Sequence, residues 1–224
     1  MSDRKVQIAL VGCGKIAQTH AMALSTLEEA DWVAVCDRDV ERAKEMAAKY
    51  NVPNVFSDAA ELFASGLVEA ALCCTPHPAH EAVVVAAANA GIHVMCEKPI
   101  ATKIDEADRM IAAADKAGIK FGVIFQRRFW PAAQRIRAAI DDGKLGNITL
   151  GLCDVRLWRG PEYFGADPWR GKWATEGGGI LMNQAVHSID HFQWFMGKAV
   201  EVYGKFATLR HGAYIDVEDT AVAT

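Results

Sequence analysis

Glycines near the N-terminus stand where an apolar segment, Val6–Val11, gives way to a predicted helix. Gly12 permits a tight turn, Gly14 lets the backbone approach phosphate oxygens, and Ala17 keeps the helix close to the sheet. The N–H groups of the first helical turn can then bind an anion. The pattern predicts a site for the pyrophosphate of a dinucleotide, although an ordinary strand–turn–helix unit gives the same spacing. The expected contacts come from Gly12, Gly14, Lys15 and Ile16.

A second apolar segment, Trp32–Cys36, ends in Asp37. A carboxylate at this place in a dinucleotide-binding fold accepts hydrogen bonds from the adenosine ribose hydroxyls, and it would repel a 2′-phosphate. Asp37 therefore favours NAD over NADP. Arg38 could pair with a 2′-phosphate if Asp37 turned away, so NADP stays open as the alternative. Asp37 could also be a plain turn residue.

Two further predicted strands end in residues that could contact a cofactor. Thr75–His80 follows one of them, and Glu97, Lys98 and Pro99 follow the next. Carboxyl ends of parallel strands are where such folds bind ligands. Because a residue before proline is restrained toward an extended backbone, the ammonium of Lys98 can be aimed into a cleft. The alternative for Lys98 is an ordinary solvated lysine.

Four segments together resemble the Gfo/Idh/MocA family of oxidoreductases, which is named for glucose–fructose oxidoreductase and inositol dehydrogenase. They are, in chain order, Gly12–Ala17, Thr75–His80, Glu97–Pro99 and Gly177–Asp190. The resemblance extends over essentially the whole chain. It implies an NAD(P)-dependent dehydrogenase acting on a CH–OH group of a sugar, a sugar derivative such as a nucleotide-sugar, or a cyclitol.

The resemblance also implies roles for individual residues. Lys98 matches the lysine that contacts the reacting hydroxyl, and His187 matches the histidine that serves as acid and base. Asn183 stands where family members often carry an aspartate; an asparagine takes no proton, so it would orient the substrate or His187. The Met-Asn-Gln run around it is familiar from the branch that oxidises sugar nucleotides. Histidine titrates near neutrality, and an ammonium stabilises a developing alkoxide, so this set suffices for alcohol oxidation.

Other candidates follow from position in the chain. The long loop from Trp158 to Gly179 contains arginine, whose fork suits a carboxylate or phosphate, and tryptophan, which suits a sugar face. It could be a substrate lid, or simply a packed loop. Expected cofactor contacts beyond the glycine turn, Asp37 and Arg38 are Thr75, Pro76, His77, His80, Glu97, Lys98 and Gln126. Expected substrate contacts are Arg127, Tyr163, Trp169, Arg170, Trp173 and Asn183.

The elements that must position these residues alternate between strand and helix up to residue 124. This pattern predicts an α/β fold with a doubly wound parallel (Rossmann) sheet, and residues 1–124 as one domain. Predicted strands are Val6–Val11, Trp32–Cys36, Val55–Phe56, Ala70–Cys74, His93–Cys96 and Lys120–Ile124. Predicted helices are Ile16–Leu24, Val40–Tyr50, Ala59–Ala64, His80–Ala90 and Ile104–Ala117.

Residues 125–224 read as an α+β domain for substrate binding and oligomerisation, with a large, mostly antiparallel sheet. Predicted helices are Pro131–Asp141 and Ile180–Met196, and predicted strands are Asn147–Leu157, Val200–Leu209 and Thr220–Ala223. The chain stops at Thr224, directly after the residues of this last predicted strand. Since domains rarely end inside a strand, we expect a C-terminally truncated chain whose second sheet is incomplete.

The composition of the chain indicates which kinds of binding partner and which cellular location to expect. The 224 residues carry a formal net charge of −4, with no basic stripe, so nucleic acid is not an expected partner. No apolar run approaches the length that a membrane span needs, and no signal peptide precedes the first strand, so we expect a cytoplasmic protein. The six cysteines are expected to be small buried apolar residues, and no cluster has the spacing of metal ligands.

The resemblance further implies self-association as a dimer or tetramer, with a small molecule as the substrate. Two alternatives remain at this point. One is a dinucleotide-binding sensor or assembly protein without turnover, which Asn183 and the abrupt C-terminus favour. The other is a reductase of the same fold acting on a non-sugar substrate such as a dihydrodiol or a tetrapyrrole.

Overall fold

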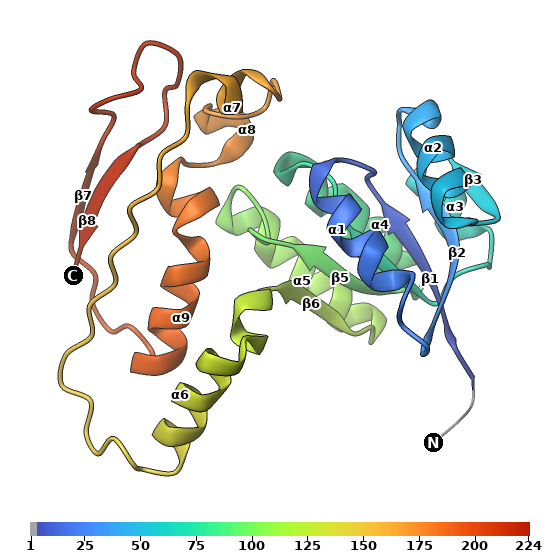
Figure 1. Ribbon diagram of the computed structural model, residues 1–224. Helices are drawn as coiled ribbons and strands as arrows, with labels where there is room; N and C mark the ends of the chain where they lie inside the picture. Colours follow the sequence, from blue (N-terminus) through green and yellow to red (C-terminus); the bar gives the residue numbers. More distant parts are fainter. Residues whose placement is uncertain (1–3) are drawn as a thin grey trace. The chain divides into compact units, whose positions relative to one another are not determined.

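The computed structural model describes residues 4–224, and the chain divides into two compact units (Figure 1). The first unit extends to Ile124, and the second comprises Phe125–Thr224. Within the described residues, no helix combines the length and the apolar character that crossing a bilayer requires.

The first unit contains a six-stranded parallel sheet with the strand order β3-β2-β1-β4-β5-β6. Because the order reverses beside β1, the carboxyl ends of β1, β4 and β5 meet at one edge, where such folds bind their ligands. The prediction of a doubly wound parallel sheet is confirmed. The strands are β1 (Val6–Val11), β2 (Ala30–Cys36), β3 (Asn54–Phe56), β4 (Ala70–Cys73), β5 (His93–Glu97) and β6 (Phe121–Ile124).

Helices cover both faces of this sheet (Figure 1). Ala17 and Met46 pack on one face, and Leu62, Val84 and Met110 pack on the other. Strand residues on both faces are therefore buried, which explains their near-continuous apolar sequence. The helices are α1 (Lys15–Leu24), α2 (Val40–Tyr50), α3 (Ala59–Ala64), the 3₁₀ turn η1 (His77–Ala79), α4 (His80–Asn89) and α5 (Ile104–Ala117).

The second unit is mainly helical, with one antiparallel strand pair formed by β7 and β8. Its helices are η2 (Gln126–Phe129), α6 (Pro131–Asp141), α7 (Pro161–Gly165), α8 (Trp173–Glu176), the π-helical turn η3 (Ile180–Gln184) and α9 (Val186–Met196). Its strands are β7 (Gly204–Ala207) and β8 (Thr220–Ala223).

Three predictions for the second unit need correction. Asn147–Leu157 forms no strand, and Leu150 and Leu152 are 73% and 89% exposed. A strand requires a hydrogen-bonded neighbour, and among the described residues no strand pairs with this segment. The strand predicted over Val200–Leu209 is confined to β7, the part that pairs with β8. The helix predicted over Ile180–Met196 divides into η3 and α9.

The cysteines follow the expectation for small buried apolar residues, with one exception. Five of the six are buried and Cys153 is exposed; none forms a disulfide in the described residues. Burial raises the pKa of Cys13 and of Cys36 to about 12, so these two thiols stay protonated.

Candidate active site

The turn between β1 and α1 has the geometry of an anion-binding loop. Gly12 has a φ of +91°, and a Cβ at this position would lie 2.8 Å from the backbone of Cys74 and Thr75. Gly14 precedes the first turn of α1, which contains no acidic residue, and no side chain of the described residues caps it. Its N–H groups are therefore suited to a phosphate. Ala17 is fully buried, which lets α1 lie against the sheet. This cradle fits a dinucleotide.

Replacement of Gly12 by alanine should weaken NAD binding at least about tenfold, because the new Cβ must displace the strand end that carries Thr75 and a positive φ costs on the order of 1–3 kcal/mol. Fluorescence titration with NADH measures the affinity. Gly66→Ala is the matched control, since Gly66 has a φ of +70° but no atom within 4 Å of its Cβ position. Unchanged affinity in Gly12→Ala would show that the loop does not hold the cofactor.

Asp37 lies at the end of β2, beside this loop. Its Oδ2 accepts a hydrogen bond from the Cys13 N–H at 2.7 Å, and its Oδ1 accepts one from the Asp39 N–H at 2.9 Å. Arg42 on α2 approaches the same carboxylate at 3.9 Å, whereas Arg38, the cation that the sequence singles out, is exposed. Arg42 is therefore a second cation beside this strand end, and the pairing of Arg38 with a 2′-phosphate stays a prediction.

Replacement of Asp37 by alanine should lower the affinity for NAD by about 10- to 100-fold, the value of a hydrogen bond to a charged group. The affinity for NADP should fall less or rise, because the carboxylate that repels a 2′-phosphate is gone while Arg42 remains. Titration with NADH and NADPH measures both values. Glu45→Gln, an exposed carboxylate on α2, is the control. An unchanged ratio of the two affinities would contradict a role for Asp37 in cofactor choice.

His80 ties together the two other strand ends of the site. Its Nδ1 lies 2.9 Å from the carbonyl oxygen of Pro99, and its Nε2 lies 2.9 Å from that of Thr75. The side chain is completely buried. The ring thus lies between the backbone of the two loops, and whichever nitrogen carries the proton donates to one of these carbonyl oxygens. The cofactor contact expected for His80 stays a prediction.

Glu97 and Lys98 follow directly in the chain. Glu97 is 5% exposed; its Oε1 contacts His20 Nε2 at 2.7 Å, and its Oε2 accepts from the Lys98 N–H at 3.1 Å. Lys98 is half-buried, and its bond to Pro99 is cis. The carboxylate of Glu97 is therefore a buried anchor for the loop rather than a surface group.

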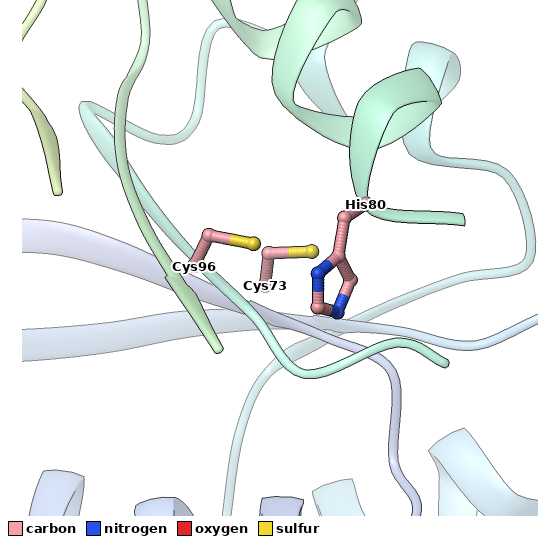
Figure 2. Close-up of side chains that lie close together, drawn as sticks. All are labelled: Cys73, His80 and Cys96. Carbon is pink, nitrogen blue, oxygen red and sulfur yellow. The ribbon is translucent and has the colours of Figure 1, made fainter. Parts of the chain in front are cut away.

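Cys73, His80 and Cys96 form a cluster that sequence spacing did not reveal (Figure 2). Cys73 and Cys96 are register partners on β4 and β5, and their sulfurs lie within 4.8 Å of each other and of a ring nitrogen of His80. A hydrogen bond from Cys96 lowers the pKa of Cys73 against the effect of burial, with help from His80 and Thr75. These are ligand types for soft metals. Each ring nitrogen of His80 also lies 2.9 Å from a backbone carbonyl oxygen.

Residues of the same loops differ in their exposure. Thr75 is half-buried, Pro76 is exposed, and His77 is 7% exposed with its ring 5.8 Å from that of His80. Their contacts with the cofactor remain predictions.

In the second unit, η2 contains Gln126 and Arg127. Gln126 is exposed, and the guanidinium of Arg127 lies 5.3 Å from the Trp130 ring. Arg128, whose role the sequence did not indicate, forms a two-pronged ion pair with Asp190 of α9, with distances of 2.8 and 2.5 Å. The pair anchors η2 to the helix that contains His187.

The glycine segment before η3 lies against the buried carboxylate of Glu218. Glu218 is 3% exposed and accepts hydrogen bonds from the N–H groups of Gly179 at 2.8 Å and Leu181 at 3.1 Å. A Cβ at Gly179 would collide with the backbone oxygen of Glu218 at 1.9 Å. Glycine is therefore required where the chain crosses Glu218, and the carboxylate satisfies the first N–H groups of the turn.

The helix that follows presents the two residues expected at the substrate. Asn183 is 9% exposed and His187 is 7% exposed. The ring of His187 makes an edge contact with Phe125, with centroids 6.0 Å apart. Asn183 belongs to the π-helical turn and His187 to α9.

Tyr163 is the centre of a polar network in the long loop. Its hydroxyl oxygen accepts from Arg170 Nη1 at 2.5 Å, from Gln184 Nε2 at 2.9 Å and from Asn183 Nδ2 at 3.2 Å. The guanidinium of Arg170 also stacks on Trp169 and donates to Asp167 at 2.9 Å. The loop is thus packed around this arginine.

Trp173 lies apart from that network. Its indole is 45% exposed and its ring centroid lies 5.9 Å from that of Phe206 on β7. Sequence reasoning missed Glu176, Gln184 and Glu218, which contact the network or the helix start. A carboxylate directly before three glycines was the one available signal for Glu176.

Glu176 is the buried carboxyl nearest to Asn183. It is 1% exposed and accepts hydrogen bonds from the Gly171 N–H at 2.5 Å and from the Asn183 side chain. Burial raises the pKa of Glu176, and Glu218 adds to this effect, while the two hydrogen bonds and Arg170 oppose it.

Each of the two units matches the model of a known protein family. Residues 6–125 match the model of the oxidoreductase family with an NAD-binding Rossmann fold, and residues 133–224 match that of the GFO/IDH/MocA C-terminal domain. The first unit is therefore an NAD-binding Rossmann domain.

Curated and solved relatives agree with this assignment. Myo-inositol 2-dehydrogenase of Thermotoga maritima is 30% identical over 88% of the chain, which spans 56% of that protein. The WlbA dehydrogenase of Bordetella pertussis, solved with NADH and UDP-GlcNAcA, is 36% identical with a TM-score of 0.92, covering 98% of this chain and 66% of its own. The WlbA dehydrogenase of Chromobacterium violaceum, also solved with NADH and UDP-GlcNAcA, is 33% identical with a TM-score of 0.93, covering 100% of this chain and 64% of its own. The chain thus spans less than two thirds of these relatives, and it belongs to the GFO/IDH/MocA family of oxidoreductases.

Proposed function

We propose that the protein is an NAD-dependent dehydrogenase that transfers a hydride between the nicotinamide and a CH–OH group of a sugar, a sugar derivative or a cyclitol. The observation that carries the proposal lies within the first unit. Val11, Cys73 and Cys96 are neighbours in register on β1, β4 and β5. The glycine cradle, Thr75 and Lys98 therefore follow adjacent strands, which supports a role for the Lys98 side chain at the edge of the sheet where we expect the cofactor.

In this proposal the chain's own residues divide the chemistry. The glycine cradle and Asp37 would hold NAD, which would supply a hydride acceptor for the carbinol carbon. The ammonium of Lys98 stabilises the alkoxide that develops on the substrate oxygen, and His187 takes the hydroxyl proton. Asn183 orients the substrate. The contacts of the His80 ring with the carbonyl oxygens of Thr75 and Pro99 hold the backbone next to Lys98 in place.

The substrate class that we favour is a nucleotide-sugar. The support is the similarity to the WlbA dehydrogenases, whose solved complexes contain UDP-GlcNAcA. Within the second unit, Arg159 stacks on the Tyr163 ring at 4.9 Å and Arg170 on the same ring at 4.4 Å. Guanidinium groups of this kind suit the carboxylate or phosphate of such a substrate.

A substrate panel with the full-length protein tests the function. Reduced nicotinamide absorbs in the near ultraviolet, so NAD reduction is followed directly with nucleotide-sugars, free sugars and cyclitols. Turnover of one class identifies the substrate. Tight binding of NAD without turnover of any alcohol or carbonyl would contradict the proposal and support a sensor or assembly protein.

Self-association and location complete the proposal. We place the protein in the cytoplasm, as the family resemblance implies, and as a homodimer or homotetramer, which the exposed apolar side chains on the strand pair support. Phe206 on β7 is 61% exposed and Val222 on β8 is 72% exposed. Light scattering of the full-length protein measures the oligomeric state, and a monomer at micromolar concentration would contradict it.

A further inference from the structure

Glu176 holds one end of the Asn183 amide. The carboxyl is almost completely buried, and each of its oxygens has a different donor. Oε2 accepts from the Gly171 N–H at 2.5 Å, and Oε1 accepts from Asn183 Nδ2. Because both oxygens of the carboxyl accept from N–H donors here, it meets the amide through nitrogen and not through oxygen.

Tyr163 holds the amide from a second direction. Its hydroxyl lies 3.2 Å from the same Asn183 Nδ2. Both hydrogens of the amide nitrogen are therefore accounted for by Glu176 and Tyr163. The carbonyl Oδ1 occupies the other end of the amide, and any group that meets Oδ1 must donate a hydrogen bond to it.

We propose that Glu176 is a positioning residue that fixes the Asn183 amide so that its carbonyl oxygen accepts a hydrogen bond from a substrate hydroxyl. The inference rests on the proposed function, in which Asn183 contacts the substrate. Asn183 then presents the acceptor that a carboxylate would present at this place, while the carboxyl itself is buried one hydrogen bond away, on Glu176. The residue pair thereby selects substrates with a hydroxyl donor at that position.

The variant Glu176→Gln tests the orientation. Glutamine has the same size but only one acceptor oxygen, which the Gly171 N–H requires. Its NH₂ group then faces Asn183, and the amide of Asn183 must turn its oxygen toward it. The substrate hydroxyl would meet a donor instead of an acceptor. We expect kcat/KM to fall about 10- to 100-fold, as for a lost hydrogen bond to a charged partner.

The variant Asn183→Asp tests the charge. It places a second carboxylate against the buried Glu176, and two carboxylates that share a site cannot both ionise without a large penalty. We expect a lower unfolding temperature and a loss of kcat/KM similar to that of Glu176→Gln.

The double variant E176Q/N183D is the decisive case, because it exchanges the carboxylate and the amide between the two positions. The new amide at position 176 can donate to one carboxylate oxygen at position 183, and the other oxygen can accept from the substrate. We expect kcat/KM and the unfolding temperature of the double variant to exceed those of both single variants. Glu201→Gln, which alters an exposed carboxylate of the same unit, should change neither value.

If the double variant E176Q/N183D instead loses the sum of what the two single variants lose, in kcat/KM and in unfolding temperature, the proposal is overturned. The two measurements also separate this proposal from the proposed function. If the wild-type protein turns over no alcohol, the proposed function fails and so does the substrate contact. The unfolding temperatures of the four proteins then still decide whether Glu176 holds the amide of Asn183.

Discussion

Replacement of Lys98 by alanine should reduce kcat by about 10²- to 10³-fold, the usual cost of removing a group that stabilises an oxyanion. Lys98 directly follows β5, whose carboxyl end is adjacent to that of β4. The contact of His80 with the Pro99 carbonyl oxygen holds the backbone next to Lys98. NAD affinity should change little, because the glycine cradle and Asp37 remain. Steady-state kinetics and NADH titration measure the two effects separately.

Lys116→Ala is the control for this variant. Lys116 is exposed in the last turn of α5, so its removal should alter neither kcat nor NAD affinity. Normal turnover of Lys98→Ala would remove Lys98 from the chemistry. A loss of NAD binding equal to the loss of turnover would instead make Lys98 a cofactor ligand only.

Replacement of His187 by glutamine should lower kcat/KM by about 10²- to 10⁴-fold, the typical contribution of a positioned acid–base group. Glutamine keeps a polar side chain but cannot exchange a proton near neutrality. The remaining activity should rise with pH, because hydroxide replaces the missing base. Kinetics across the pH range measure this change.

Gln193→Ala provides the comparison on the same helix, since Gln193 is exposed on α9 and should be silent. The unfolding temperature of His187→Gln separates a catalytic loss from a folding defect, because His187 is nearly buried and packs against Phe125. Full activity of a folded His187→Gln variant would assign proton transfer to another group.

The first unit was predictable because its signals are local. Apolar strands, the glycine turn and helix-ending residues lie next to each other in the chain, and the predicted helices Val40–Tyr50 and Ile104–Ala117 have the bounds found in the structure. Asp39 caps the first of these helices through the Arg42 N–H, and Gly118 ends the second with a φ of +66°. Such capping residues are readable from sequence.

The second unit was less predictable because its elements depend on distant partners. The segment Asn147–Leu157 alternates like a strand, yet a strand forms only where another strand supplies hydrogen bonds. The π-helical turn at Ile180–Gln184 follows a chain crossing over Glu218, a residue far along the sequence. Periodicity within one segment contains no information about either partner.

Within the candidate site, sequence identified residue types better than their neighbours. It selected His80 but not its two carbonyl partners, and it selected Arg38 but not Arg42, which lies 3.9 Å from the Asp37 carboxylate. It also selected Asn183 without Glu176. These contacts depend on how loops and helices pack, which the spacing of residues along the chain does not determine.

The most direct test of the catalytic proposal is a crystal structure of the full-length protein with NAD and a substrate identified by the panel. We predict one substrate hydroxyl within hydrogen-bond distance, about 3 Å, of both Lys98 Nζ and a ring nitrogen of His187, with its carbon facing the nicotinamide. A bound substrate whose reacting hydroxyl contacts neither group would contradict the account.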